Sequence, residues 1–114
     1  MITLYHNPRC SKSREALALL EQYAKPFQVV EYLQTPLNEA TLVELLRKLD
    51  LTAGDVIRTK EEEFKQLGLD RNNVTEQQLL NAIVKHPRLL ERPIVVVGDK
   101  AAIGRPLSNI TAIL

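Results

Sequence analysis

Residues 6–15 gather the residue types that could do nucleophilic or redox chemistry. They include Cys10, the only cysteine among the 114 residues, with Arg9, Lys12 and Arg14 close beside it. The thiolate is the reactive form of cysteine, and neighbouring cations favour it. A lone cysteine is often a small buried hydrophobic residue, but Cys10 stands in a polar, cationic stretch rather than in an apolar run. We therefore interpret Cys10 as a candidate nucleophile.

The flanking segments predict how Cys10 is positioned. The short apolar run at 2–5 is typical of a strand, and the apolar residues from Ala16 to Tyr23 recur at helical spacing. A helix is thus expected over 11–24, and Cys10 falls in the turn that precedes it. Helix starts carry unpaired backbone N–H groups and a partial positive charge. Such a turn favours a thiolate and can also hold a small oxyanion.

The remaining pattern predicts an α/β protein. A strand is expected at 27–32, and Asn38 is a suitable N-cap for a helix over 39–49. A short helical piece is expected at 55–57. Two capping boxes, Thr59 with Glu62 and Thr75 with Gln78, predict helices that end at Gly68 and near His86. Residues 94–97 and 100–103 are typical of a hairpin, and Pro106 is expected in the first turn of a last helix.

This order resembles a thioredoxin-like mixed four-stranded sheet flanked by helices, with an inserted helical segment at about 38–86. The length predicts a single domain over residues 1–114. Thioredoxin-like sheets place a cis-proline beside the cysteine turn, and Pro93, just before a buried-looking strand, is the candidate for it. His6 is close enough in sequence for an imidazolium to favour the thiolate, although a purely structural role is equally compatible with its spacing.

Composition excludes several function classes. A net charge of +1 gives no general attraction to nucleic acid or membranes. No apolar run is long enough to span a bilayer, and the first residues lack the pattern of a signal peptide. One cysteine allows no internal disulfide and cannot alone form a zinc site. A reducing cytoplasm is the natural compartment for a lone cysteine, so we expect a cytoplasmic protein. We further expect it to be a monomer with no metal and no bound cofactor.

Three arginines stand where loops should meet strands or helices: Arg58, Arg92 and Arg105. A guanidinium offers a planar fork of donors that suits tetrahedral oxyanions. Most arginines are solvated surface residues. Arg92 and Arg105 are the stronger candidates for binding because each lies between the end of an element and a proline.

Five segments together resemble the glutaredoxin-coupled arsenate reductase family over nearly the whole chain: the cysteine turn at 6–14, residues 66–69, His86-Pro87, residues 91–96 and residues 104–106. The resemblance implies reduction of arsenate to arsenite with electrons from glutathione, as co-substrate, and glutaredoxin. It implies that Cys10 is the nucleophile. The oxyanion would be held by Arg58, Arg92 and Arg105, and the turn would be shaped by His6, Ser13, Arg14 and Pro93.

Two other readings stay open. The best-studied relatives of this type carry Gly-Thr after the cysteine, where this chain has Ser11-Lys12, so a glutathione-dependent thiol reductase with a non-arsenic substrate is the first alternative. The second is a redox regulator similar to the Spx group, which binds RNA polymerase. That group usually carries a second cysteine three residues after the first, where this chain has Ser13, so we rank this reading lower.

Overall fold

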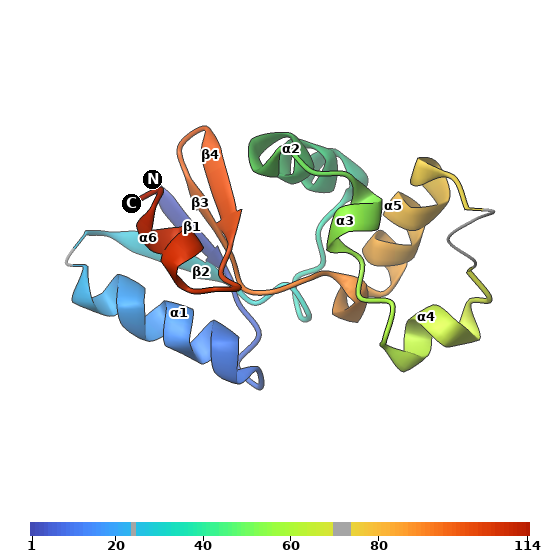
Figure 1. Ribbon diagram of the computed structural model, residues 1–114, viewed down its shortest axis with the longest axis horizontal. Coiled ribbons are helices and arrows are strands. Elements are labelled where there is room, and N and C mark those ends of the chain that lie inside the picture. The colour runs from blue at the N-terminus through green and yellow to red at the C-terminus, as the bar shows by residue number, and fades with distance from the viewer. Residues whose placement is uncertain (24, 70–73) are drawn as a thin grey trace. The chain divides into compact units, whose positions relative to one another are not determined.

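The computed structural model describes residues 1–23, 25–69 and 74–114 (Figure 1). The chain divides into two compact units, which are residues 1–35 together with 92–114, and residues 36–91. The first unit contains Cys10, Arg92 and Arg105, whereas the second contains Arg58. The helical segment expected at 38–86 lies within the second unit. The expectation of one domain over the whole chain stays a prediction.

The first unit is built on a four-stranded mixed sheet, as predicted. Its strands are β1 (Ile2–Tyr5), β2 (Phe27–Val30), β3 (Ile94–Val97) and β4 (Lys100–Ile103), in the order β2-β1-β3-β4. Strand β1 runs parallel to β2 and antiparallel to β3, and β3 and β4 form the antiparallel hairpin. Strand β2 ends two residues before the predicted boundary, because a turn begins at Glu31, whose carbonyl accepts from the backbone N–H groups of Gln34 and Thr35.

Two helices, α1 (Ser11–Gln22) and α6 (Ser108–Thr111), complete this unit (Figure 1). Its core consists of Ile2, Leu4, Ala16, Leu20, Val95 and Ile110. Alternate residues of a strand share a face, and Leu4 is paired with Val95. Both helices therefore bury apolar side chains against the same face of the sheet. Helix α1 is described to Gln22, and Ala24, its expected last residue, lies outside the described part of the chain.

The prediction that Pro106 lies in the first turn of the last helix is wrong. Helix α6 begins at Ser108, after Leu107. The backbone N–H of Asn109 donates to the Pro106 carbonyl, and that of Ile110 donates to the Leu107 carbonyl. These three-residue spacings form a tighter turn than an α-helix, so the proline precedes the helix. The Arg105–Pro106 peptide bond is cis, as is the Arg92–Pro93 bond that the fold resemblance suggested.

The second unit contains helices α2 (Glu39–Leu49), α3 (Ala53–Val56), α4 (Glu62–Gln66) and α5 (Glu76–Lys85), and a 3₁₀ turn η1 (Pro87–Leu89). Asn38 caps α2 as predicted, because its side chain accepts from the Thr41 N–H at 2.7 Å. The Thr75–Gln78 capping box is likewise confirmed. Within the part of the chain that the structure describes, no helix combines the length and apolar character needed to cross a bilayer.

Two local predictions in the second unit need correction. The short helical piece expected at 55–57 is present as α3, but it ends at Val56, because Ile57 pairs with Leu90 in an isolated β-bridge. The Thr59–Glu62 capping box does not form. The backbone N–H of Glu61 donates to the Arg58 carbonyl in a turn, and Glu61 is then the N-cap of α4. Helix α4 ends just before Gly68, whose φ of +66° suits the expected glycine stop.

Candidate active site

Cys10 occupies the N-cap of α1, with an extended backbone (φ −95°, ψ 123°). Its N–H donates to the Asn7 carbonyl and its own carbonyl accepts from the Arg14 N–H, each at 3.0 Å. This hydrogen bonding fixes the residue at the point where the turn becomes helix. The first N–H groups of a helix have no partners within it and concentrate positive charge, so the sulfur stands at an electropositive position. The residue is 8% exposed.

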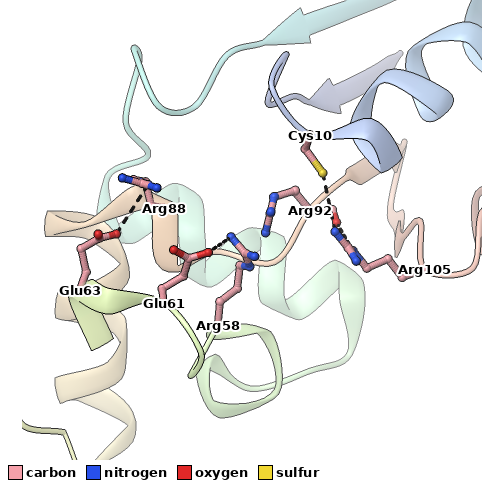
Figure 2. A network of polar contacts seen from close by, with 7 residues as sticks. All are labelled: Cys10, Arg58, Glu61, Glu63, Arg88, Arg92 and Arg105. Atoms are coloured by element: carbon pink, nitrogen blue, oxygen red, sulfur yellow. Dashed lines mark hydrogen bonds and ion pairs between the residues drawn. The ribbon is translucent and has the colours of Figure 1, made fainter. Parts of the chain in front are cut away.

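Arg105 lies against the sulfur. Its Nη2 donates to Cys10 Sγ at 3.7 Å, and its Nε donates to the backbone carbonyl of Arg92 at 2.8 Å. Figure 2 shows Arg105 joined to both Cys10 and Arg92. One guanidinium thus uses two of its nitrogens, one to fix its own position and one to contact the sulfur. Of the three arginines singled out from the sequence, Arg105 contacts the sulfur directly, and the Arg92 backbone carbonyl holds the Arg105 side chain.

Pro93 and Gly104 support this arrangement from the sheet. The Gly104 N–H donates to the Pro93 carbonyl at 2.8 Å. A Cβ at Gly104 would lie 2.6 Å from Ile110 Cδ1 and 2.9 Å from Pro93 Cγ, so only glycine allows this approach. The loop that carries Arg105 is therefore held tightly against the segment that carries Arg92.

A buried polar network shapes the cysteine turn. His6 Nδ1 and Ser13 Oγ share a hydrogen bond of 2.7 Å, and the same Oγ accepts from the Asn7 N–H at 3.0 Å. The Arg14 side chain reaches back to the Pro8 carbonyl at 2.9 Å. The three residues expected to shape the turn, His6, Ser13 and Arg14, thus all contact it or form part of it.

His6 is almost completely buried, at 5% exposure. Burial lowers its pKa below the ordinary value of 6.5. The charge of Arg14 adds to this effect, whereas that of Glu31 opposes it. The ring is therefore neutral at neutral pH, and Nδ1 of a neutral ring can accept a hydrogen bond that the Ser13 hydroxyl donates. This environment favours the structural role of His6 over that of an imidazolium beside the thiolate.

Arg58 belongs to the second unit. Its guanidinium forms an ion pair with Glu61, and both side chains are mostly covered, at 23% and 18% exposure. Its backbone N–H donates to the Leu89 carbonyl at 2.7 Å. Arg88 in the same unit pairs with Glu63 at 3.7 Å (Figure 2). The expected role of Arg58 in holding an oxyanion stays a prediction.

Sequence reasoning overlooked two asparagines. The Asn7 side chain accepts from the Arg9 N–H at 3.0 Å and its main chain joins the network described above. Its position before Pro8 is a known turn signal and could have identified it. Asn109 in α6 donates to backbone carbonyls near Arg105, and nothing in the local sequence marks it. Among the described residues, no group of three or more His, Cys, Asp or Glu side chains could hold a metal ion.

A mixed four-stranded sheet, a cysteine at the start of the first helix and a cis-proline before the third strand define a protein with the thioredoxin-like fold. The ArsC family model matches residues 5–113, so this chain belongs to the ArsC family.

Two curated relatives and one solved structure resemble it over nearly their whole length. An arsenate reductase from Neisseria meningitidis serogroup A is 51% identical over 114 residues, covering 99% of this chain and 97% of the relative. An uncharacterized protein from Escherichia coli strain K12 is 46% identical over 114 residues, with 99% and 96% covered. The solved structure of an arsenate reductase from Vibrio cholerae has a TM-score of 0.94 at 42% identity, covering 99% of this chain and 97% of that one.

Proposed function

We propose that this protein reduces arsenate to arsenite, with Cys10 as the nucleophile and glutathione and glutaredoxin as electron donors. The observation that carries the proposal is the contact between Arg105 Nη2 and Cys10 Sγ at the start of α1. A guanidinium donating to a sulfur stabilises the thiolate, which is the attacking form. The arsenate reductase relative at 51% identity gives independent support for the substrate.

The electron count defines the steps. Reduction of arsenate takes two electrons, and one thiol cannot supply both by closing an internal disulfide. The Cys10 thiolate attacks arsenic and displaces an oxygen, which leaves as water after protonation, to form an S–As bond. A glutathione thiol then adds. Arsenic departs as arsenite, and the two sulfur atoms, each oxidised by one electron, become a Cys10–glutathione disulfide. Glutaredoxin accepts the glutathione by thiol–disulfide exchange and regenerates Cys10.

The other site residues receive roles that follow from their chemistry. Arg92 and Arg105 stabilise the negative charge of the oxyanion and of the thiolate, and Arg58 is proposed as the third clamp. His6, Ser13, Arg14 and Pro93 hold the turn in the geometry that Cys10 requires. The reducing cytoplasm keeps a lone cysteine as a thiol, and we propose that the protein acts there as a monomer.

The test is an assay in which arsenate-dependent NADPH oxidation is coupled through glutathione reductase, glutathione and glutaredoxin. We expect wild-type protein to be active and Cys10→Ser to be inactive. Ser11→Ala is the matched control, since Ser11 is an exposed neighbour on the same helix, and it should keep full activity. Turnover by Cys10→Ser would refute the assignment of the nucleophile.

The same assay separates the alternatives. A glutathione-dependent thiol reductase would reduce a glutathionyl mixed disulfide without any arsenate, and wild-type protein would then show no oxyanion-dependent oxidation. The Spx-like group usually carries a second thiol at the position that Ser13 occupies in this chain. Ser13 there is buried and hydrogen-bonded to His6, so its hydroxyl is already used in shaping the turn. A pull-down with RNA polymerase tests that reading directly, and we expect no polymerase to be retained.

A further inference from the structure

Asn109 holds the backbone of the loop that presents Arg105. This residue lies in α6, and its Nδ2 donates to the Ile103 carbonyl at 3.1 Å and to the Arg105 carbonyl at 3.4 Å. The two acceptors lie on either side of Gly104. A single amide therefore ties the end of β4 and the start of the following turn to the last helix.

The opposite side of the same loop is held by the sheet. Gly104 donates to the Pro93 carbonyl at 2.8 Å, and a Cβ there would lie 2.6 Å from Ile110 Cδ1. The helix that carries Asn109 is anchored by Ile110, which is completely buried in the core. The loop is thus fixed between a buried helix residue and the segment around Pro93, and Asn109 provides the hydrogen bonds on the helix side.

The side chain of Arg105 connects this loop to the Cys10 sulfur. Arg105 donates to the Arg92 carbonyl at 2.8 Å and to Cys10 Sγ at 3.7 Å. Its backbone carbonyl is one of the two that Asn109 holds. An arginine has many rotamers, and holding its backbone reduces the number of positions its guanidinium can adopt. The hydrogen bond between Arg105 Nη2 and Cys10 Sγ therefore depends on where the main chain of residue 105 lies.

We propose that Asn109 is a positioning residue that sets the Arg105 guanidinium on the Cys10 sulfur. It acts through Arg105 and does not touch the sulfur itself. Its effect on turnover rests on the proposed function, in which the Cys10 thiolate attacks arsenate. Its effect on the thiolate does not, because the thiolate can be measured without any substrate.

The experiment measures the thiolate by its ultraviolet absorbance at neutral pH in the full-length protein, with arsenate turnover as a second readout. Asn109→Leu keeps the size of the side chain and removes the amide donors. We expect a thiolate fraction lowered about threefold to tenfold, the range that the positioning energy of one hydrogen bond implies. Asn109→Ala serves the same purpose if the leucine variant does not fold, as judged by circular dichroism. Thr111→Val, at an exposed position of the same helix, is the matched control and should leave the thiolate unchanged.

A double-mutant cycle distinguishes positioning from a general loss of structure. In an Arg105→Ala background, Asn109→Leu should produce no further loss of thiolate, because the group it positions is gone. An equal loss in both backgrounds, or an unchanged thiolate in Asn109→Leu alone, would overturn the proposal. If the thiolate falls as expected but wild-type protein does not turn over arsenate, the positioning role stands and the proposed function fails.

Discussion

Replacing Arg105 by lysine tests whether the geometry of the guanidinium, and not only its charge, supports Cys10. The guanidinium contacts two acceptors at once, the Arg92 carbonyl at 2.8 Å and Cys10 Sγ at 3.7 Å. A lysine ammonium is a single point on a flexible stem and cannot reproduce this fork. We expect it to bind the carbonyl or the sulfur, but not both in the present geometry.

The expected loss can be estimated from the contact at the sulfur. Hydrogen bonds to charged groups contribute about 1.5–3 kcal/mol. Arg105 is exposed to solvent, which screens its charge, so the lower end of that range applies. A loss of about 1.5 kcal/mol corresponds to roughly a tenfold reduction in the equilibrium that forms the thiolate. Arg105→Ala removes the charge as well and should lose at least as much.

Thiolate absorbance at neutral pH and arsenate turnover in the coupled assay measure this effect in parallel. Arg88→Lys is the matched control. Arg88 lies in the second unit, is 65% exposed and pairs with Glu63 at 3.7 Å, so its replacement should change neither quantity. Wild-type values of both in Arg105→Lys would refute the argument that the fork geometry matters. If Arg105→Ala loses thiolate absorbance and turnover while Arg105→Lys keeps wild-type values, then a positive charge at residue 105 is sufficient to support Cys10, whatever its geometry.

Three further predictions concern the stability of the site. Ser13→Ala leaves His6 Nδ1 and the Asn7 N–H without the hydroxyl that binds both, and should lower the free energy of unfolding by about 1–3 kcal/mol in urea titrations. Gly104→Ala forces a methyl group against Ile110 and should cost about 1–3 kcal/mol in the same measurement. Burial lowers the pKa of His6 below 6.5 in the folded state. Its contribution to stability is therefore complete above pH 6.5 and is lost as the pH falls toward the folded value, because the unfolded state then binds the proton more readily.

Controls separate these effects from general perturbation. Ser11 lies two residues from Ser13 but is exposed. Ser11→Ala should therefore leave the free energy of unfolding nearly unchanged, whereas Ser13→Ala should lower it. Equal stabilities would contradict the buried network. For His6, the pH dependence should be absent from His6→Asn. A retained dependence would assign it to another group.

The local elements could largely be predicted because they depend on neighbours in sequence. The starts of α2 and α5 were predictable because their capping contacts span only three residues, from Asn38 to Thr41 and from Thr75 to Gln78. One failure arose where a distant partner intervened, and the other two arose where the chain makes a local turn. Ile57 lies outside α3 because it pairs with Leu90 in a β-bridge. Glu61, and not Thr59, is the N-cap of α4, because a turn that begins at Arg58 precedes the helix. The Pro106 prediction failed because the chain makes a tight turn before α6.

By itself, the sequence determined that Cys10 lies at the start of the first helix, with cations close beside it. One cysteine, followed by an amphipathic helix and accompanied by cations, is sufficient to place a sulfur at a helix start. Only the tertiary structure decided which arginine contacts that sulfur, because Arg105 is 95 residues away along the chain and reaches it through the pairing of β3 with β1 and β4. It also decided that His6 is buried and neutral, since desolvation depends on what the fold packs around a side chain and not on its neighbours in sequence.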